Sequence, residues 1–244
     1  MAPCLRDMRV NFLVRPLTWA VDQLLPRHCI ACGAASGESN LCPPCLGELP
    51  RISHGCKQCG MALALSSDSI CGTCLGRPPP WHNGTAALDY RFPIDQLVCL
   101  FKFQRNLACG ELLAQELSRA VSQSQTPSPD IIVPVPLHRR RQFSRSFNQA
   151  EVLAEPVARA LGIPLVCGVL RRARSTRAQS GLTAAERRKN IRGAFRCKGA
   201  VPPHVALVDD VLTTGATLAE CTRAVLRAGA DEVSIWVAAR ANVR

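Results

Sequence analysis

Eight cysteines are crowded into residues 29–74, where they form four Cys-x-x-Cys pairs. Such a pair places two thiolates on one side of a metal ion, and two pairs complete a tetrahedron with metal–sulfur distances of about 2.3 Å. The array therefore predicts two structural zinc ions. The predicted ligands are Cys29, Cys32, Cys42, Cys45, Cys56, Cys59, Cys71 and Cys74. The spacing leaves open whether neighbouring pairs share a zinc ion or interleave.

Disulfide bonds are the alternative use of so many cysteines, but they persist only in an oxidising compartment. The N-terminal segment is apolar, yet Arg15, Pro16 and Asp22 interrupt it and it has no small-residue cleavage site. It therefore resembles neither a secretion signal nor a membrane span. We expect a cytoplasmic protein with reduced cysteines and no membrane insertion, in which residues 1–27 form a short amphipathic helix. A helix lying in the plane of the membrane is the alternative for this segment.

The cysteine-rich segment has too little apolar content to fold without metal. The composition changes at residues 76–84, where three consecutive prolines disfavour regular structure. We therefore predict an N-terminal helical segment at 1–27, a double zinc-ribbon module at 28–80 and a second domain at 81–244. For the module we favour a structural or docking role, and direct contact with nucleic acid is the alternative.

In the second domain, short apolar runs of strand length alternate with longer helical patterns. The strands are expected at residues 84–90, 130–136, 164–170, 205–210 and 232–240. The helices are expected at residues 94–104, 107–121, 147–162 and 215–230. Strands that alternate with helices are joined by crossovers, which predicts an α/β fold with a parallel sheet covered by helices on both faces. Ligands of such sheets bind at the carboxyl ends of the strands.

Two adjacent acids, Asp209 and Asp210, end one of these apolar strands and are followed by the turn sequence TTGAT. The backbone N–H groups and threonine hydroxyls of such a turn can hold a phosphate monoester at the start of a helix. The glycine lets the backbone approach a ligand closely, because it lacks a Cβ atom. The two carboxylates can accept hydrogen bonds from a ribose diol or hold a divalent cation. A sugar 5-phosphate with a vicinal diol therefore fits both halves of the motif.

An ordinary helix-capping turn is the alternative interpretation of TTGAT, with Thr213 or Thr214 as the cap. A capping turn leaves the two acids unexplained, because carboxylates at the buried end of a strand need a partner. We therefore favour the phosphate-binding interpretation.

The stretch VALVDDVLTTGATL resembles, position by position, the phosphoribosyl-pyrophosphate (PRPP) loop of type I phosphoribosyltransferases. The resemblance implies a phosphoribosyltransferase-like sheet in which Asp209 and Asp210 are catalytic and bind the ribose hydroxyls. The implied 5-phosphate cradle comprises Thr213, Thr214, Gly215, Ala216 and Thr217.

Residues 29–240 are similar to ComF/GntX proteins, which join a cysteine-rich zinc module to a phosphoribosyltransferase-like domain. The motifs that carry this similarity are the eight-cysteine array, FKFQRN, IIVPVPLHRRR, SRSFNQA, TRAQSGLTAAERRKNIRGAF and the acidic loop. One departure is Ser146, where the family usually has glycine.

Positive charge is concentrated between residues 139 and 198, where there are fifteen Lys or Arg and three Glu, whereas the whole chain has a formal net charge of +12. By analogy with phosphoribosyltransferases, the pyrophosphate would be flanked by Leu137, His138 and Arg139. A flexible hood would include Gln179, Ser180, Arg187, Arg188, Lys189 and Asn190, and we expect its last four residues to contact nucleic acid as well. Pyrophosphate needs only a few cations, so the surplus suits a second polyanion, most simply single-stranded DNA. A solvated basic face that only aids solubility is the alternative.

These observations lead to two functions. The first, which we favour, is a protein that binds PRPP with Mg²⁺ and assists the uptake of transforming DNA by binding single strands. The family resemblance implies a helicase-like partner for this role. The second is an active phosphoribosyltransferase, which would transfer the phosphoribosyl group to an unidentified nucleobase or amine and release pyrophosphate. The sequence contains no obvious segment for recognising a base, so turnover stays open.

Overall fold

The computed structural model describes residues 27–37, 39–64, 69–124, 126–137, 147–173 and 191–242. The chain divides into two compact units, Met1–Leu49 and Pro50–Arg244. The predicted N-terminal helix at residues 1–27 falls almost entirely outside the described residues.

The smaller unit is organised around the first four cysteines. Strands β1 Arg27–His28 and β2 Ala35–Gly37 pair antiparallel, and the short helix α2 Pro43–Gly47 follows them. Gly33 lies in the turn between the two strands with a φ of 77°, a conformation that favours glycine. The turn and the start of α2 each bring one Cys-x-x-Cys pair to the same place.

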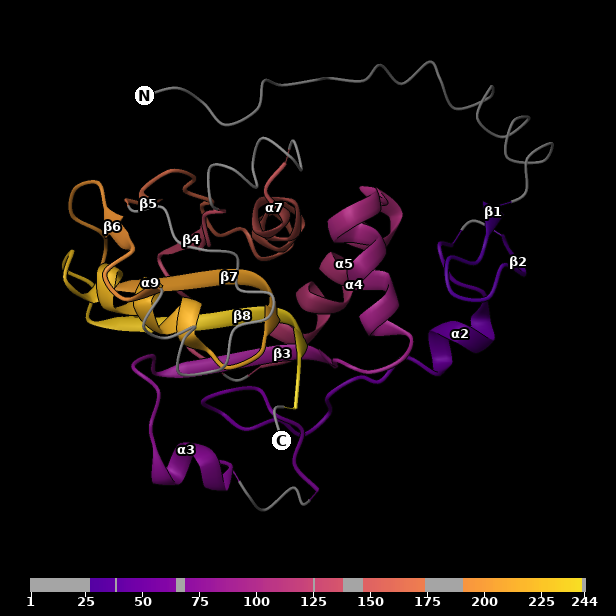
Figure 1. The fold of residues 1–244 in the computed structure, drawn as a ribbon, viewed down its shortest axis with the longest axis horizontal. Helices are drawn as coiled ribbons and strands as arrows, with labels where there is room; N and C mark the ends of the chain where they lie inside the picture. Colours follow the sequence, from indigo (N-terminus) through magenta and orange to yellow (C-terminus); the bar gives the residue numbers. More distant parts are fainter. Residues whose placement is uncertain are drawn as a thin grey trace. The chain divides into compact units, whose positions relative to one another are not determined.

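The larger unit is built on a parallel four-stranded sheet with the strand order β3-β8-β7-β4 (Figure 1). Its strands are β3 Asn83–Asp89, β8 Glu232–Arg240, β7 His204–Leu212 and β4 Ile131–Pro134. The central strand β8 is buried at every position after its first residue. Such continuous burial is expected of a parallel sheet that is covered on both faces.

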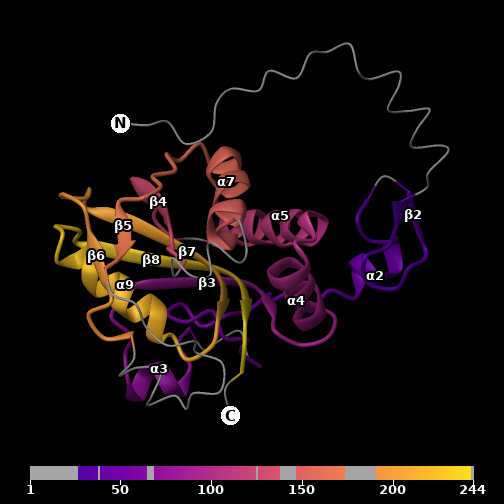
Figure 2. The ribbon, with the colours of Figure 1, turned by 45° about the horizontal axis from the view of Figure 1, so that its top comes forward.

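Helices cover the two faces of this sheet (Figure 2). Helices α5 Leu107–Gln123 and α7 Gln149–Leu161 lie on one face, and α9 Ala216–Leu226 lies on the other. Helix α4 Ile94–Gln104 follows β3 and packs against α5. The predicted α/β fold is confirmed.

One predicted strand is wrong. Residues 164–169 form no strand, and Leu165 makes only an isolated parallel bridge with Ile132. Gly168 has a φ of 76° and interrupts the apolar run. The chain then forms β5 Leu170–Arg172, which pairs antiparallel with β6 Phe195–Cys197 in a separate small sheet.

The edge strand β3 is covered by residues 50–57, which lead into the second group of cysteines. The amide of Ile52 donates to Ala87 O (3.0 Å), and the amide of Asp89 donates to Pro50 O (2.8 Å). The amide of Gly84 donates to Lys57 O at 2.7 Å. An exposed edge strand offers unpaired backbone groups to other chains, and these bonds satisfy some of those groups.

Candidate functional site

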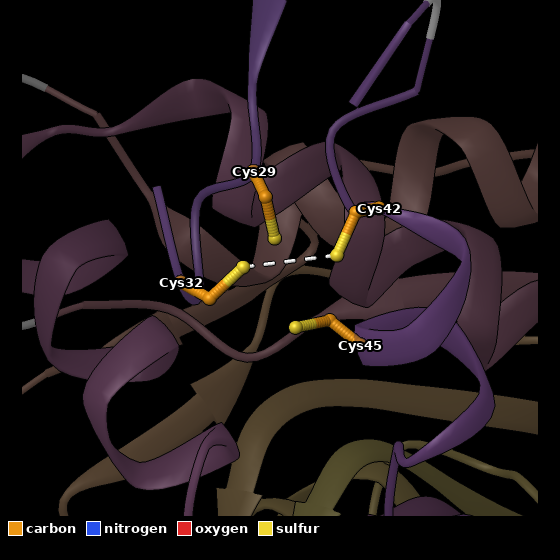
Figure 3. Close-up of side chains that lie close together, drawn as sticks. All are labelled: Cys29, Cys32, Cys42 and Cys45. Carbon is orange, nitrogen blue, oxygen red and sulfur yellow. Dashed lines mark hydrogen bonds between the residues drawn. The ribbon is translucent and has the colours of Figure 1, made fainter. Parts of the chain in front are cut away.

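The eight cysteines form two Cys4 clusters, and each cluster uses two successive Cys-x-x-Cys pairs. The first cluster is Cys29, Cys32, Cys42 and Cys45, and the second is Cys56, Cys59, Cys71 and Cys74. Figure 3 shows the sulfur atoms of the first cluster pointing toward a common centre. Successive pairs therefore share a site, which settles the choice that the spacing left open.

The sulfur geometry of both clusters fits a tetrahedral metal ion. In each cluster all four sulfur atoms lie within 4.8 Å of one another. The sulfur atoms of Cys32 and Cys42 are 3.7 Å apart, as are those of Cys59 and Cys71. Four sulfurs at about 2.3 Å from a tetrahedral zinc ion would be about 3.8 Å apart. The donor sets thus fit two structural zinc ions.

In each cluster, one cysteine thiol has a lowered pKa. Burial raises the pKa of Cys29, but backbone N–H groups near its sulfur, that of Cys42 foremost, lower the pKa to about 6. In the second cluster, a hydrogen bond with the Cys59 thiol lowers the pKa of Cys56 to about 4, and the amide of Cys71 donates to the Cys56 sulfur at 3.3 Å. Zinc binds the thiolate form, so these contacts prepare the sulfurs for the metal.

Asp209 and Asp210 lie near the carboxyl end of β7. The strand ends at Leu212, two residues later than predicted, and Asp209 is in register with Val237 of β8. Side chains of adjacent strand residues point to opposite faces. Burial and then the charge of Asp209 raise the pKa of Cys221, on α9, well above its usual value. The joint assignment of both acids to ribose hydroxyls stays a prediction.

Asp210 has a partner that the sequence analysis did not find. The Nζ atom of Lys102, on α4, lies 2.9 Å from Asp210 Oδ1, and their side chains are only 21% and 13% exposed. Lys102 belongs to the FKFQRN motif, but nothing in the sequence indicated that this motif reaches the acidic pair. The ion pair meets the requirement that a largely buried carboxylate has a partner.

The carboxyl group of Asp209 is held close to its neutral form. Burial raises its pKa to about 7, and the negative charge of Asp210 adds to the rise. The backbone N–H of Asp210, which donates to Asp209 Oδ1 at 2.9 Å, and the charge of Lys102 both oppose it. Near neutral pH this group can therefore either donate or accept a hydrogen bond.

The turn after β7 leads directly into α9. The N-cap residue of α9 is Gly215, with a φ of 74°. Backbone N–H groups at the start of a helix point away from the helix and can bind a phosphate group. The N-cap position is thus Gly215 rather than Thr213 or Thr214, and the choice between a phosphate-binding turn and a capping turn stays a prediction. Arg240 holds the turn in place, since its Nη1 atom donates to the carbonyls of Leu212 and Thr213, each at 3.0 Å.

Trp81 connects this turn to the second Cys4 cluster. The indole Nε1 donates to the carbonyl of Gln58, between two cluster cysteines, at 2.5 Å. The ring is 5% exposed, and a Cβ atom on Gly215 would lie 2.9 Å from Trp81 Cη2. Only glycine fits here, both because the φ is positive and because the indole ring occupies the space of a side chain.

A cavity of about 1350 Å³ opens beside α9. We call it the α9 cavity. Its lining includes the turn Thr213–Gly215, the proline run 78–80, and residues of β6 and α9. It also includes six arginines: Arg77, Arg192, Arg196, Arg223, Arg227 and Arg240. Only Arg192 and Arg196 fall within the basic segment 139–198, and the fold brings the other four to the same place.

Several predicted site residues lie outside the described part of the chain. These are His138, Arg139, Gln179, Ser180, Arg187, Arg188, Lys189 and Asn190. Leu137 is described and half-buried, just after β4. Val135 donates to Val208 O at 2.9 Å, so the chain leaves β4 beside Asp209. The pyrophosphate and hood assignments stay predictions.

Comparison with known proteins finds relatives along most of the chain. A model of the double zinc ribbon domain matches residues 20–75. DNA utilization protein YhgH of Salmonella typhi is 38% identical over 205 residues, which cover 82% of this chain and 90% of that protein. Competence protein F of Haemophilus influenzae is 35% identical over 224 residues, which cover 88% of this chain and 97% of that protein.

More distant likenesses are also present. Competence protein ComFC of Bacillus subtilis is 25% identical over 205 residues, which cover 79% of this chain and 80% of that protein. Among solved structures, adenine phosphoribosyltransferase of Leishmania tarentolae aligns with a TM-score of 0.36 and 17% identity over 64% of this chain and 76% of that one. Within the described residues, the helices are too short or too polar to cross a membrane.

Proposed function

Because the chain belongs to the ComF/YhgH family, we propose that it binds PRPP with Mg²⁺ at the carboxyl edge of its sheet and assists DNA uptake by binding single-stranded DNA. The relatives' names refer to DNA utilization and competence, which supports the DNA half of this proposal. The PRPP half rests on one observation. Two adjacent carboxylates at the end of β7 are followed by a turn that enters α9 at a glycine with a positive φ.

The described residues suit the parts of PRPP in different ways. The N–H groups at the start of α9 suit the 5-phosphate, because they carry partial positive charge and Gly215 lets a ligand approach the backbone closely. Asp209 and Asp210 suit the ribose hydroxyls, and they are the hard oxygen donors that Mg²⁺ prefers. Bound Mg²⁺ would neutralise part of the pyrophosphate charge. In the free protein, Lys102 balances the charge of Asp210 instead.

Calorimetric titration with PRPP and Mg²⁺ tests this assignment. We expect the double substitution Asp209→Asn and Asp210→Asn to abolish PRPP binding, because amides lose the negative charge that the diol and the cation require. The zinc content should stay near two ions per chain, since both Cys4 clusters consist of cysteines alone. Wild-type affinity in the double variant would remove the ribose assignment.

The alternative function is an active phosphoribosyltransferase. The two functions can be separated by measuring pyrophosphate release. The protein is incubated with PRPP, Mg²⁺ and a panel of nucleobases and amines. Acceptor-dependent release that disappears in the Asp209→Asn, Asp210→Asn variant would identify an enzyme. PRPP binding without release for any acceptor would support a binding protein.

A further inference from the structure

The positive charge that lines the α9 cavity comes from arginine side chains. Among the described residues, its six lining arginines are accompanied by no lysine and by one carboxylate, that of Glu220. Glu220 is already engaged, because it pairs with Arg223 and accepts the amide of Gly193 at 2.7 Å. Guanidinium groups are planar and match phosphate oxygens with two parallel hydrogen bonds, which an ammonium group cannot do. This lining therefore favours a phosphate-bearing ligand.

Three of these arginines are available to a ligand. Arg77, Arg196 and Arg227 are exposed, and no carboxylate of the described residues forms an ion pair with any of them. They come from three different segments: the end of α3 Gly72–Gly76, strand β6 and the end of α9. Like charges gathered from separate segments cost folding free energy unless a ligand of opposite charge uses them.

The size and the aromatic content of the cavity indicate what kind of ligand this is. Pockets for single small molecules measure about 300–1,000 Å³, and the α9 cavity is larger, at about 1350 Å³. Its two aromatic side chains, Trp81 and Phe195, are 5% and 1% exposed. They are therefore packed into the core and offer no face on which a base can stack. The ligand should be long, phosphate-rich and held without recognition of its bases.

We propose that the α9 cavity binds the sugar–phosphate backbone of a single DNA strand, at arginines outside the predicted hood. This inference rests on the proposed function and deepens it, because it places the strand beside the second Cys4 cluster. The strand site touches the turn Thr213–Gly215 but does not include Asp209 or Asp210. Strand binding and ribose binding thus depend on different side chains.

The test compares two double substitutions in the full-length, zinc-loaded protein. One is Arg196→Glu with Arg227→Glu, in the α9 cavity. The matched control is Arg91→Glu with Arg159→Glu, which changes the net charge equally at exposed arginines outside the cavity. Fluorescence anisotropy with a labelled oligothymidylate, over a series of KCl concentrations, gives the affinity and its salt dependence for each protein.

We expect the cavity variant to bind the strand at least about tenfold more weakly than the control variant. Its plot of log affinity against log salt should be shallower by about 1 to 2, because each lost phosphate contact removes about 0.7 from the slope for a single strand. Its affinity for PRPP should match that of the wild type. The neutral pair Arg196→Gln and Arg227→Gln should show a smaller loss in the same direction, and it replaces the charge reversal if that variant fails to fold.

Three results would overturn the proposal. Equal affinities and equal slopes in the cavity and control variants would place the strand elsewhere, while leaving the proposed function intact. Displacement of the strand by polyglutamate as readily as by unlabelled DNA would show a site for any polyanion. Failure of the wild-type protein to bind strands at all would refute this proposal together with the DNA half of the proposed function, and PRPP calorimetry would still test the other half.

Discussion

At the scale of single residues, the acidic pair of β7 contains two carboxyl groups with different surroundings. Asp210 lies in ion-pair contact with Lys102. Asp209 is half-buried, and removal of its carboxyl group from water raises its pKa from 3.8 to about 7. Folding therefore favours the protonated form of Asp209. Its contribution to the free energy of unfolding is fully present below about pH 4 and is lost as the pH rises through about 7.

Asp209→Asn should therefore stabilise the protein most at alkaline pH. We expect the melting temperature of the variant to exceed that of the wild type by several degrees at about pH 8, and by much less at about pH 5, since one pKa unit corresponds to about 1.4 kcal/mol. Thermal unfolding across this pH range measures the effect. The exposed Asp231 provides the control, and a difference that matched that of Asp231→Asn at every pH would contradict the burial of a charge at Asp209.

Lys102→Met should destabilise the fold, because it leaves the largely buried carboxylate of Asp210 without its partner. We expect a loss of about 1–3 kcal/mol in the free energy of unfolding, less than for a fully buried pair, because both side chains retain some exposure. Adding Asp210→Asn should recover most of the loss. A double variant as unstable as the sum of the two single variants would show that the ion pair does not couple these residues, and urea denaturation of all four proteins gives the values.

At the scale of elements, the start of α9 is positioned by segments far away in the sequence. Arg240 at the end of β8 holds the carbonyls of the turn. Trp81, just before β3, packs against Gly215 and donates to the loop of the second Cys4 cluster. The turn Thr213–Gly215 is therefore held in place by β8 and by the loop of the second Cys4 cluster. Its geometry does not depend on a ligand.

Gly215→Ala should weaken the binding of ribose 5-phosphate and PRPP by at least about tenfold, which corresponds to about 1.4 kcal/mol. The added Cβ atom would lie 2.9 Å from the Trp81 ring, at a residue whose φ is 74°. Gly168→Ala is the control, since Gly168 has a φ of 76° but nothing within 4 Å of an added Cβ atom. Calorimetry should show normal affinity for Gly168→Ala, and equal losses in both variants would exclude a specific role for the contact with Trp81.

At the scale of the whole molecule, the two Cys4 clusters belong to different units. The second cluster is part of the same hydrophobic core as Trp81 and the sheet strands. Gly84 of β3 shows how close this packing is, because a Cβ atom there would lie 2.1 Å from the carbonyl oxygen of Gln58. The first Cys4 cluster therefore organises the smaller unit, whereas the second is packed into the hydrophobic core of the larger unit.

Removal of each zinc site separately should have unequal effects. Cys56→Ser with Cys59→Ser should lower the melting temperature of the larger unit and expose β3 amides to hydrogen exchange, because the segment that covers β3 loses its anchor. Cys29→Ser with Cys32→Ser should remove one zinc ion and leave β3 protected. Metal analysis confirms the loss in each variant. Equal protection of β3 in both would show that the second cluster does not support the sheet.

Much of this architecture could be predicted from the sequence, because it depends on local patterns. The strand at 232–240 and the helix at 94–104 have the predicted bounds, since each has an uninterrupted apolar pattern of one period. The strand at 164–170 was predicted wrongly, because Gly168 has a positive φ and interrupts the apolar run. The contacts of Lys102, Trp81 and Arg240 could not be predicted, because they join segments that are more than twenty residues apart and no local pattern records such pairings.

The backbone pairing between residues 50–57 and β3 bears on how this protein should be cut. Composition alone suggests a fragment that starts at the proline run. In such a fragment the edge strand β3 would be uncovered, and a second chain could pair with it. Such material is expected to aggregate during expression. A truncation that starts at Pro50 keeps the protective segment together with its metal ligands.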